Sequence, residues 1–536
     1  MFAVILISTA VLLGIAYRYY GRFLERVTGI DDQNPTPAVV VNDGVDYVPT
    51  RASVVFGHHF SSIAGAGPIV GPIVAAAAFG WAPTWIWVVI GSIFIGGVHD
   101  FGSTVVSLRY GGKSIVEAFR QIVGQRTGKL LLLFVLITLI YVIIVFLDLT
   151  AASFTGMPAV ATASGWFVLM ALAFGWVILK TRMHYGAAIG VFIFLTYLGL
   201  ALGHFFPAPV LSKDFWIVVV LIYCFVAAIL PVSVLMQPRD FLSATFLYAI
   251  LGLGLLGAIV GPKAFDIPAF TAFESANLGM LVPFLFITVA CGACSGFHSM
   301  VASGTTSKQL SRETDVRKVT YGGMLVEGIL ATLAIGCIAV SGGMKSSPID
   351  TFASGAAIFF SSLGIPTKLG TEFAMLAVST FLLTTLDTCT RLARFLIEEL
   401  FGWSGAASRY LSTLFVCLVA GYLTFQKFTD LSGNAVPAWL ALWPLFGATN
   451  QLLAALALTT FTVFLKSRGI SYIFAAIPAA VMIAMPMTAL SIMAVSPALD
   501  PMLRVASALQ LVMAVFIIGM SMKFLVKTAE PALRPQ

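Results

Sequence analysis

Residues 56–72 read Phe-Gly-His-His-Phe-Ser-Ser-Ile-Ala-Gly-Ala-Gly-Pro-Ile-Val-Gly-Pro and place two adjacent histidines directly before a run rich in Gly and Pro. In a bilayer every backbone N–H and C=O needs a partner, so a helix breaks only where protein or a wet cavity surrounds it. Pro68 favours the first turn of a new helix, whose N-terminus suits a carboxylate. The alternative is that the small residues only permit close helix packing. Because ionisable groups at membrane depth are rare without a function, we interpret this segment as a transport site built from a discontinuous helix.

The composition requires a membrane. The chain of 536 residues is 59% hydrophobic and 10% charged, against about 25% charged residues in a soluble domain. Its mean hydropathy is +0.99, so lipid must act as the solvent for most of its surface. All six cysteines lie in apolar segments, which argues against a disulfide framework. The sequence contains no Walker loop, nucleotide-binding glycine motif or nucleophile elbow in a suitable context, so we expect neither an enzyme nor ATP hydrolysis.

Apolar runs of spanning length predict an all-α polytopic membrane protein with about 15 transmembrane helices. The predicted spans lie near 2–17, 62–79, 84–108, 129–147, 164–180, 186–203, 215–235, 241–261, 280–302, 319–341, 370–390, 409–425, 438–465, 471–493 and 504–523. Arg18, Arg22 and Arg26 follow the first apolar run rather than precede it, so we expect an anchor helix and not a cleavable signal.

The distribution of positive charge predicts the orientation. With the N-terminus outside, all but six of the 30 Lys and Arg residues fall on inner loops and ends, as the positive-inside rule requires. The six outer cations are Lys213, Lys263, Lys345, Lys368, Lys427 and Arg504. The net charge of +7 therefore reflects a bias toward the inner face and does not indicate a nucleic-acid partner.

A second candidate site lies on the following apolar segment, where Asp100 follows His99. A lipid-facing carboxylate at the bilayer centre costs about 2.5–3.5 kcal/mol, so Asp100 should face the protein interior. The alternative is that it lies near the inner end of the span and is solvated there. Since adjacent helical residues point to different faces, we do not expect His99 and Asp100 to serve one site.

A third candidate lies in residues 288–300, which are rich in small and hydroxyl-bearing side chains. Ser295, His298 and Ser299 share one helix face at spacings i, i+3 and i+4. We expect this segment to unwind or to pack against the break at 56–72. Cys291 and Cys294 form a CxxC without a second pair, which is weak support for metal or redox chemistry.

Two further features of the sequence stand out. Asp387 either holds an ion or pairs with Arg391 at i, i+4, and the pair is slightly favoured. Pro231 and Pro238 suggest a second broken or kinked helix between them.

The motifs at 57–68 (GHHFSSIAGAGP), 97–101 (GVHDF) and 294–299 (CSGFHS) resemble those of the carbon starvation protein CstA family, over nearly the whole chain. The resemblance implies a transporter of the bacterial inner membrane, induced in carbon starvation, with peptides and pyruvate as substrates and proton symport for pyruvate. It also implies the amino acid–polyamine–organocation superfamily and its LeuT-like core, a five-plus-five inverted repeat with discontinuous helices.

We expect one extra helix before this core and about four after it. In this register 62–79 is core helix 1, 215–235 is core helix 6 and 280–302 is core helix 8; a rival register pairs 62–79 with 280–302 directly. The expected parts are residues 1–51 as the N-terminal anchor helix and cytoplasmic cap, 52–390 as the ten-helix transport core, and 391–536 as C-terminal helices.

We therefore expect a secondary active importer of a small carboxylate such as pyruvate, or of short peptides. The residues expected to bind substrate are His58, His59, Ser61, Ser62, Gly65, Ala66, Gly67, Ser295 and His298, with backbone groups of Gly65, Ala66 and Gly67 on the carboxylate. The residues expected to couple an ion are His59, Asp100, His298, Ser299 and Asp387. Histidine titrates near neutrality, which favours H⁺, while Na⁺ stays an alternative. We expect no cofactor and no resident metal, and the oligomeric state is open.

Two rival functions remain open from the sequence. One is a nutrient sensor that binds a ligand without transport. The other is a divalent metal-ion transporter that uses His58, His59, Asp100 and His298 as ligands.

Overall fold

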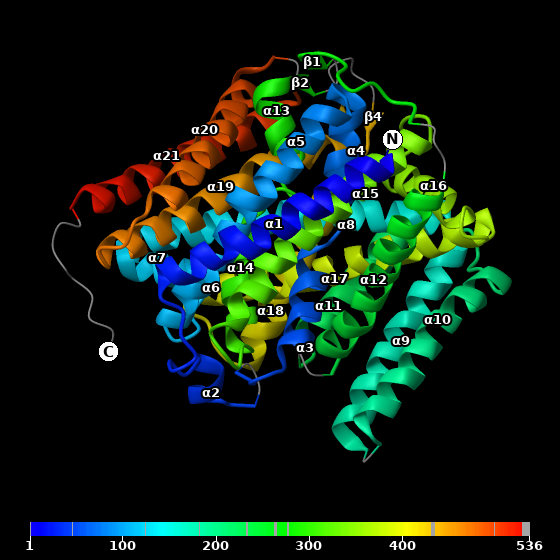
Figure 1. The fold of residues 1–536 in the computed structure, drawn as a ribbon, viewed down its shortest axis with the longest axis horizontal. Coiled ribbons are helices and arrows are strands. Elements are labelled where there is room, and N and C mark those ends of the chain that lie inside the picture. Colours follow the sequence, from blue (N-terminus) through cyan, green and yellow to red (C-terminus); the bar gives the residue numbers. More distant parts are fainter. Residues whose placement is uncertain are drawn as a thin grey trace.

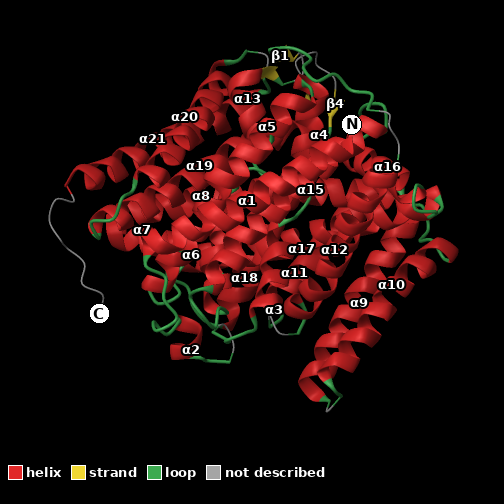
Figure 2. Cartoon of the chain, viewed as in Figure 1, coloured by secondary structure: helices red, strands yellow, loops and turns green. Residues whose placement is uncertain are grey.

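The computed structural model describes residues 2–527 except 45–46, 124, 182, 232–233, 262–264, 276–277, 430–434 and 498. The described chain is a closely packed set of helices with two very short hairpin strand pairs at one end (Figures 1 and 2). Arg182, Lys263 and Arg534, which contribute to the predicted charge asymmetry, lie outside the described residues.

The helices follow one another with short connections. They are α1 (Phe2–Thr28), α2 (Pro37–Val41), α3 (Ala52–Ile63), α4 (Gly67–Phe79), α5 (Trp81–Gly91), α6 (Gly97–Arg109), α7 (Ile115–Val123), α8 (Gln125–Gly156), α9 (Pro158–Lys180), α10 (Tyr185–Phe205), α11 (Lys213–Ile229), α12 (Met236–Val260), α13 (Leu281–Thr288), α14 (Gly296–Gly304), α15 (Gly322–Val340), α16 (Pro348–Ser361), α17 (Thr367–Phe401), α18 (Ala406–Thr424), α19 (Ala438–Ser467), α20 (Ile473–Val495) and α21 (Pro501–Lys527).

Three short helical turns and four short strands complete the chain. They are the π-helical turns η1 (Ser92–Gly96) and η3 (Arg317–Tyr321), the 3₁₀ turn η2 (Thr306–Lys308), and the antiparallel pairs β1 (Glu274–Ser275) with β2 (Gly279–Met280) and β3 (Phe428–Thr429) with β4 (Ala435–Val436).

The polytopic all-α class is confirmed, whereas the count of 15 spans stays a prediction. Among the described residues, 12 helices are long and apolar enough to cross a membrane, and 13 if the bent pair α3/α4 is one span. The two remaining predicted spans correspond to α11, which has only 17 residues, and to α13 with α14, which are separated by a non-helical segment.

The first discontinuous helix is the one predicted at 56–72. Helix α3 ends at Ile63, α4 starts at Gly67 with Pro68 in its first turn, and the two meet at an angle of 44°. Ala64 leaves the helical conformation with ψ of 53°. The prediction of a broken helix at this point is therefore confirmed.

The second discontinuous helix is α13/α14, not the segment between Pro231 and Pro238. Helix α13 ends at Thr288 and α14 begins at Gly296; within the break Gly292 has φ of +87°, a conformation that disfavours any side chain. Pro231 and Pro238 instead lie around the connection between α11 and α12, which are separate helices. The prediction of a broken helix between Pro231 and Pro238 was wrong, because Pro231 follows the end of one helix and Pro238 lies in the first turn of the next.

The two breaks lie against each other. A Cβ on Gly67 would be 2.3 Å from the Cβ of Cys291, and one on Gly292 would be 3.2 Å from the Cα of Pro68. A Cβ on Gly71 would be 2.5 Å from the carbonyl oxygen of Thr288. Small residues thus let the two backbones approach closely at membrane depth. The rival register, which pairs 62–79 with 280–302, agrees with this arrangement.

Other helices surround the crossing point. Helix α8 packs along α17, and both pack against α11 and α18; helix α12 lies against α3, and α19 lies against α14 and α8. Helices α9 and α10 pack mainly on each other and form a hairpin at the edge of the molecule (Figure 1).

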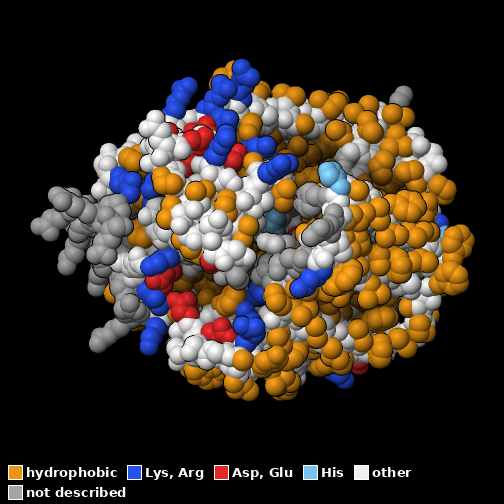
Figure 3. All heavy atoms as spheres, turned by 90° about the horizontal axis from the view of Figure 1, so that it is seen from below, with side chains coloured by type: hydrophobic (Ala, Val, Ile, Leu, Met, Phe, Trp, Pro, Cys, Tyr) orange, Lys and Arg blue, Asp and Glu red, His pale blue; other side chains and the backbone are white. Residues whose placement is uncertain are grey.

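The molecule has two distinct ends. We call the end that carries α2 the α2 end, and the end that carries β1 the β1 end (Figure 1). Figure 3 looks onto the α2 end and shows many Lys and Arg side chains around a hollow, beside a broad hydrophobic surface.

Candidate functional site

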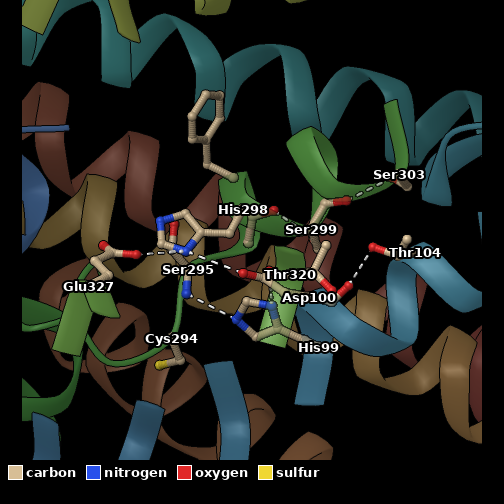
Figure 4. Close-up of polar contacts among 12 residues, drawn as sticks. His99, Asp100, Thr104, Cys294, Ser295, His298, Ser299, Ser303, Thr320 and Glu327 are labelled. Carbon is tan, nitrogen blue, oxygen red and sulfur yellow. Dashed lines mark hydrogen bonds and ion pairs between the residues drawn. The ribbon is translucent and has the colours of Figure 1, made fainter. Parts of the chain in front are cut away.

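A cluster of fully buried ionisable side chains lies beside the crossing of the two broken helices (Figure 4). We call His99, Asp100, His298 and Glu327 the break cluster. His298 is its centre: its Nδ1 lies 3.4 Å from Oε2 of Glu327 and 3.8 Å from Oδ2 of Asp100. Each of the four side chains is at most 1% exposed. Two carboxyl groups and two imidazoles in such proximity can exchange protons and hold each other's charge.

His99 belongs to this cluster, contrary to the expectation that it and Asp100 serve different sites. Its Nδ1 lies 2.8 Å from Oδ1 of Asp100, and its Nε2 accepts a hydrogen bond from the Ser295 amide at 3.1 Å. The expectation failed because it treated the side chains as fixed on their helix faces. The break at 289–295 places the Ser295 N–H against Nε2 of His99, while Nδ1 of the same ring faces Asp100.

Glu327 is a member that the sequence analysis missed. Its Oε1 accepts a hydrogen bond of 3.0 Å from the amide of Gly292, inside the second break, while its Oε2 faces His298. It comes from α15, whose sequence GGMLVEGILATLAIGCIAV has no other charged residue. The rule that singled out Asp100, the cost of a carboxylate at membrane depth, would have found Glu327 as well.

The breaks enclose a cavity of only about 10 Å³, which is room for about one water molecule. It is lined by Ile63, Gly65, Gly67, Val142, Phe146, Cys291, Phe297, His298, Thr385 and Phe446. At the start of α4 Pro68 has no N–H, and the amides of Ile69 and Val70 donate to the carbonyl of Ala66. Among the described residues, the amides of Ala66 and Gly67 are therefore the ones left without a backbone acceptor at this helix N-terminus. The cavity therefore combines apolar walls with a helix N-terminus and one imidazole, His298, whose Nε2 has no partner at normal hydrogen-bond geometry among the described residues. The Ile63 carbonyl also faces this imidazole.

Side chains of α19 bind the backbone of the second break. Asn450 accepts a hydrogen bond from the Phe297 amide at 2.9 Å and donates one to the Ser295 hydroxyl at 3.0 Å. Gln451 donates to the carbonyl of Phe286 at 2.6 Å. These amides satisfy backbone groups that the interrupted helix leaves free.

The remaining predicted residues near the breaks have local partners. The hydroxyls of Ser61 and Ser62 donate to the carbonyl of His58, and that of Ser299 donates to the carbonyl of Gly296. His59 is buried, and its Nδ1 lies 2.9 Å from the hydroxyl oxygen of Thr306. Their roles in substrate or ion binding stay predictions.

His58 and Asp387 lie in a different group, with Arg239. Asp387 is held by the guanidinium of Arg239 and accepts a hydrogen bond of 3.0 Å from the Tyr223 hydroxyl, whereas Arg391 donates to the carbonyls of Ala227 and Leu230. The helix-end pair of Asp387 with Arg391 was therefore the wrong partner choice, because Arg239 comes from α12 and no local spacing could predict it.

The residues named for a metal site do not converge on one point. His58 faces Asp240, His59 faces Thr306, and His298 faces Glu327 and Asp100. Within the described part of the chain, no group of three or more His, Cys, Asp or Glu side chains is placed to hold a metal ion.

Comparison with known proteins identifies the family. The sequence model of the carbon starvation protein CstA family matches residues 2–344 and 338–489. The chain belongs to the carbon starvation protein CstA family. Among its relatives in this family, the peptide transporter CstA of Helicobacter pylori (strain ATCC 700392 / 26695) is 34% identical over 544 residues, covering 87% of this chain and 78% of the relative. The pyruvate/proton symporter BtsT of Escherichia coli (strain K12) is 32% identical over 575 residues, covering 89% and 79%.

The fold of this CstA family member is also found in a solved transporter. The crystal structure of the Eremococcus coleocola manganese transporter in complex with an aromatic bis-isothiourea substituted compound superposes with a TM-score of 0.52 at 11% identity, covering 91% of this chain and 99% of that one. At this identity the likeness concerns the fold alone, and it supports the LeuT-like, discontinuous-helix architecture predicted from the sequence. As a member of this family the chain is a transporter and not an enzyme.

Proposed function

We propose that this chain is a proton-coupled importer of a small carboxylate such as pyruvate, or of short peptides, in the bacterial inner membrane. The names of its relatives, a peptide transporter and a pyruvate/proton symporter, supply the two substrate classes and the coupling ion. The observation that carries the proposal is the contact of two broken helices beside four buried ionisable side chains. Such groups at membrane depth are the usual mark of a substrate and proton pathway.

In this proposal the substrate carboxylate binds at the N-terminus of α4. The backbone groups of Gly65, Ala66 and Gly67 surround it, and His298 completes the site from α14. The helix dipole and the amides of Ala66 and Gly67 favour an anion at this point. Phe146 and Phe446, which line the same cavity, contact the apolar part of the substrate. The cavity must widen before substrate can enter, as expected of an alternating-access transporter.

The break cluster carries the coupling proton in this proposal. Asp100 and His298 were predicted for this role, and Glu327 joins them because its carboxylate faces the same imidazole. A proton that moves within the cluster changes the charge facing His298 and hence its attraction for a carboxylate. The substrate and the proton are thereby linked through one side chain.

The orientation and the extent of the core are also proposed. In this proposal the α2 end, with its Lys and Arg side chains, faces the cytoplasm and the N-terminus faces the periplasm, as the positive-inside rule favours. We propose that the ten-helix core runs from α3 to α19 rather than ending near residue 390. In this register α3/α4 corresponds to α13/α14, α8 to α17, and α9–α10 is an inserted hairpin.

Uptake by the purified protein in liposomes tests the function. Labelled pyruvate and labelled di- and tripeptides are offered while the pH gradient and the Na⁺ gradient are imposed separately. Accumulation of pyruvate or a peptide that requires the pH gradient supports the proposal. Ligand binding without accumulation would identify a nutrient sensor instead, and accumulation of Mn²⁺ or another divalent cation would identify a metal-ion transporter.

A further inference from the structure

A second buried group of charges lies apart from the break cluster. We call His58, Tyr223, Arg239, Asp240 and Asp387 the Arg239 cluster. Arg239 contacts Asp387 and lies 2.6 Å from Oδ1 of Asp240, and it donates to the Tyr223 hydroxyl at 2.8 Å. Nδ1 of His58 lies 3.1 Å from Oδ2 of Asp240. The cluster therefore joins four helices, α3, α11, α12 and α17.

With Asp240 and Asp387 both ionised, the charges of this cluster balance when His58 carries a proton. The guanidinium of Arg239 is always charged, and it faces two carboxylates, Asp240 and Asp387. All three side chains are fully buried, so one negative charge in excess would be costly there. The imidazole of His58 can supply the missing positive charge, and it can also give it up.

Of the charged residues in the Arg239 cluster, His58 is the one that lines a cavity at the α2 end, which we call the α2-end cavity. Its side chain is 11% exposed, whereas Arg239, Asp240 and Asp387 are 0% exposed. It lines a cavity of about 220 Å³. The other residues lining this cavity are Val48, Thr50, Val54, Phe174, Ile178, Gln237, Pro238, Phe241 and Gln309, and they include no acid or base. A proton that reaches His58 from this cavity meets one charged partner, Asp240.

Titratable and charged groups lie near His58 on its own helix and on the helices packed against it, including the Tyr248 hydroxyl of α12, which would be 3.7 Å from a Cβ on Gly57. His59 follows it on α3 and is fully buried. Helix α12 contributes Asp240, with Arg239 behind it, and α17 contributes Asp387 through Arg239. Among the described residues, Asp240 is the carboxylate within ion-pair distance of His58.

We propose that His58 is a proton-coupling site of this transporter and that its ion pair with Asp240 stabilises the contact between α3 and α12. This inference rests on the proposed function. The protonated imidazole holds Asp240 and balances the cluster. When the proton passes from the imidazole to water in the α2-end cavity, the pair weakens, and the half-helix α3 can separate from α12. Proton release is thereby tied to movement of the first broken helix.

The test separates coupling from transport itself. The variants His58→Asn and His58→Gln are reconstituted as full-length protein in liposomes, and labelled pyruvate is the probe. The Asn amide takes the place of Nδ1 and can still donate to Asp240, but it cannot release a proton. Two quantities are measured: accumulation driven by a pH gradient, and exchange of external label for internal pyruvate without any gradient. His204→Gln is the matched control, because His204 pairs with a carboxylate too, Glu372, at 2.7 Å.

The expected result is a selective loss. Gradient-driven accumulation by His58→Asn should fall by about tenfold or more, while exchange continues near the wild-type rate and the control retains both activities. Accumulation at the wild-type level in both His58 variants would overturn the inference, and so would equal loss of accumulation and exchange in a correctly folded variant. If the wild-type protein neither accumulates nor exchanges pyruvate or peptides, it is the proposed function that fails.

Discussion

His298 and Glu327 face each other across the second break, with Nδ1 of the imidazole 3.4 Å from Oε2 of the carboxyl group. The same glutamate accepts the amide of Gly292 at 3.0 Å. Glu327 therefore binds the backbone of the second break and also determines the charge that faces His298 beside the small cavity. These two duties can be separated by substitution.

Glu327→Gln keeps an oxygen acceptor for the Gly292 amide but removes the negative charge. We expect a folded protein whose gradient-driven uptake falls by about tenfold or more, because removal of a proton-transferring group typically costs at least this much. Uptake in liposomes measures the effect. Glu372→Gln, which alters another carboxylate paired with a histidine, is the control and should stay near wild type. Normal uptake by Glu327→Gln would remove this residue from the coupling mechanism.

Gly292→Ala tests the close contact of the two breaks. Gly292 and Gly364 both have φ of +87°, but a Cβ on Gly292 would be 3.0 Å from Ala331 Cβ and 3.2 Å from Pro68 Cα, whereas one on Gly364 meets nothing within 4 Å. Both alanine variants bear a backbone cost of about 1–2 kcal/mol. Only Gly292→Ala adds an overpacking cost of about 1–3 kcal/mol.

Thermal unfolding of the two glycine variants in detergent measures this difference. The midpoint should fall further for Gly292→Ala than for Gly364→Ala, and only Gly292→Ala should also lose uptake. Equal midpoints would show that the breaks can separate without cost.

Gly67 and Cys291 should behave as a coupled pair. A Cβ on Gly67 would overlap the Cβ of Cys291 at 2.3 Å, so Gly67→Ala should destabilise the protein and impair uptake. Cys291→Gly removes the opposing atoms, and the double variant should regain part of the stability. We expect a coupling free energy of about 1–3 kcal/mol in a double-mutant cycle. Strict additivity of the two single effects would contradict the contact.

Asn450 should matter for stability more than its neighbour does. Asn450→Ala removes the acceptor of the Phe297 amide, and a buried donor without a partner costs about 1–3 kcal/mol. Thr449→Val is the control, because the Thr449 hydroxyl donates only to carbonyls of its own helix. Thermal unfolding should show a clear loss for Asn450→Ala and a small change for Thr449→Val. Similar losses for both would mean that α19 does not cap the second break.

The sequence predicted well wherever a local rule applied. The break at 64–66 follows from Gly and Pro in an apolar segment, and the burial of Asp100 follows from the cost of a carboxylate in lipid. The choice between two registers needed longer-range information. Pro231 and Pro238 have the composition of a break, yet only the packing of Gly67 on Cys291 distinguishes the partner of the first broken helix.

The partners of the charged residues could not be predicted for the same reason. Asp387 and Arg239 are 148 positions apart, and His58 and Asp240 also come from different helices. Spacing rules within one helix reach only about one turn, so they favoured Arg391 as the partner of Asp387. Glu327 differs from these cases, since its lone charge in α15 was visible in the sequence and was not used.

The cavity of about 10 Å³ at the crossing of the broken helices has a consequence for the cell. A binding site that closes to the size of a single water molecule excludes sugars, amino acids and hydrated ions. Copies of the protein in this closed form can therefore lie idle in the membrane without letting small metabolites leak through the site.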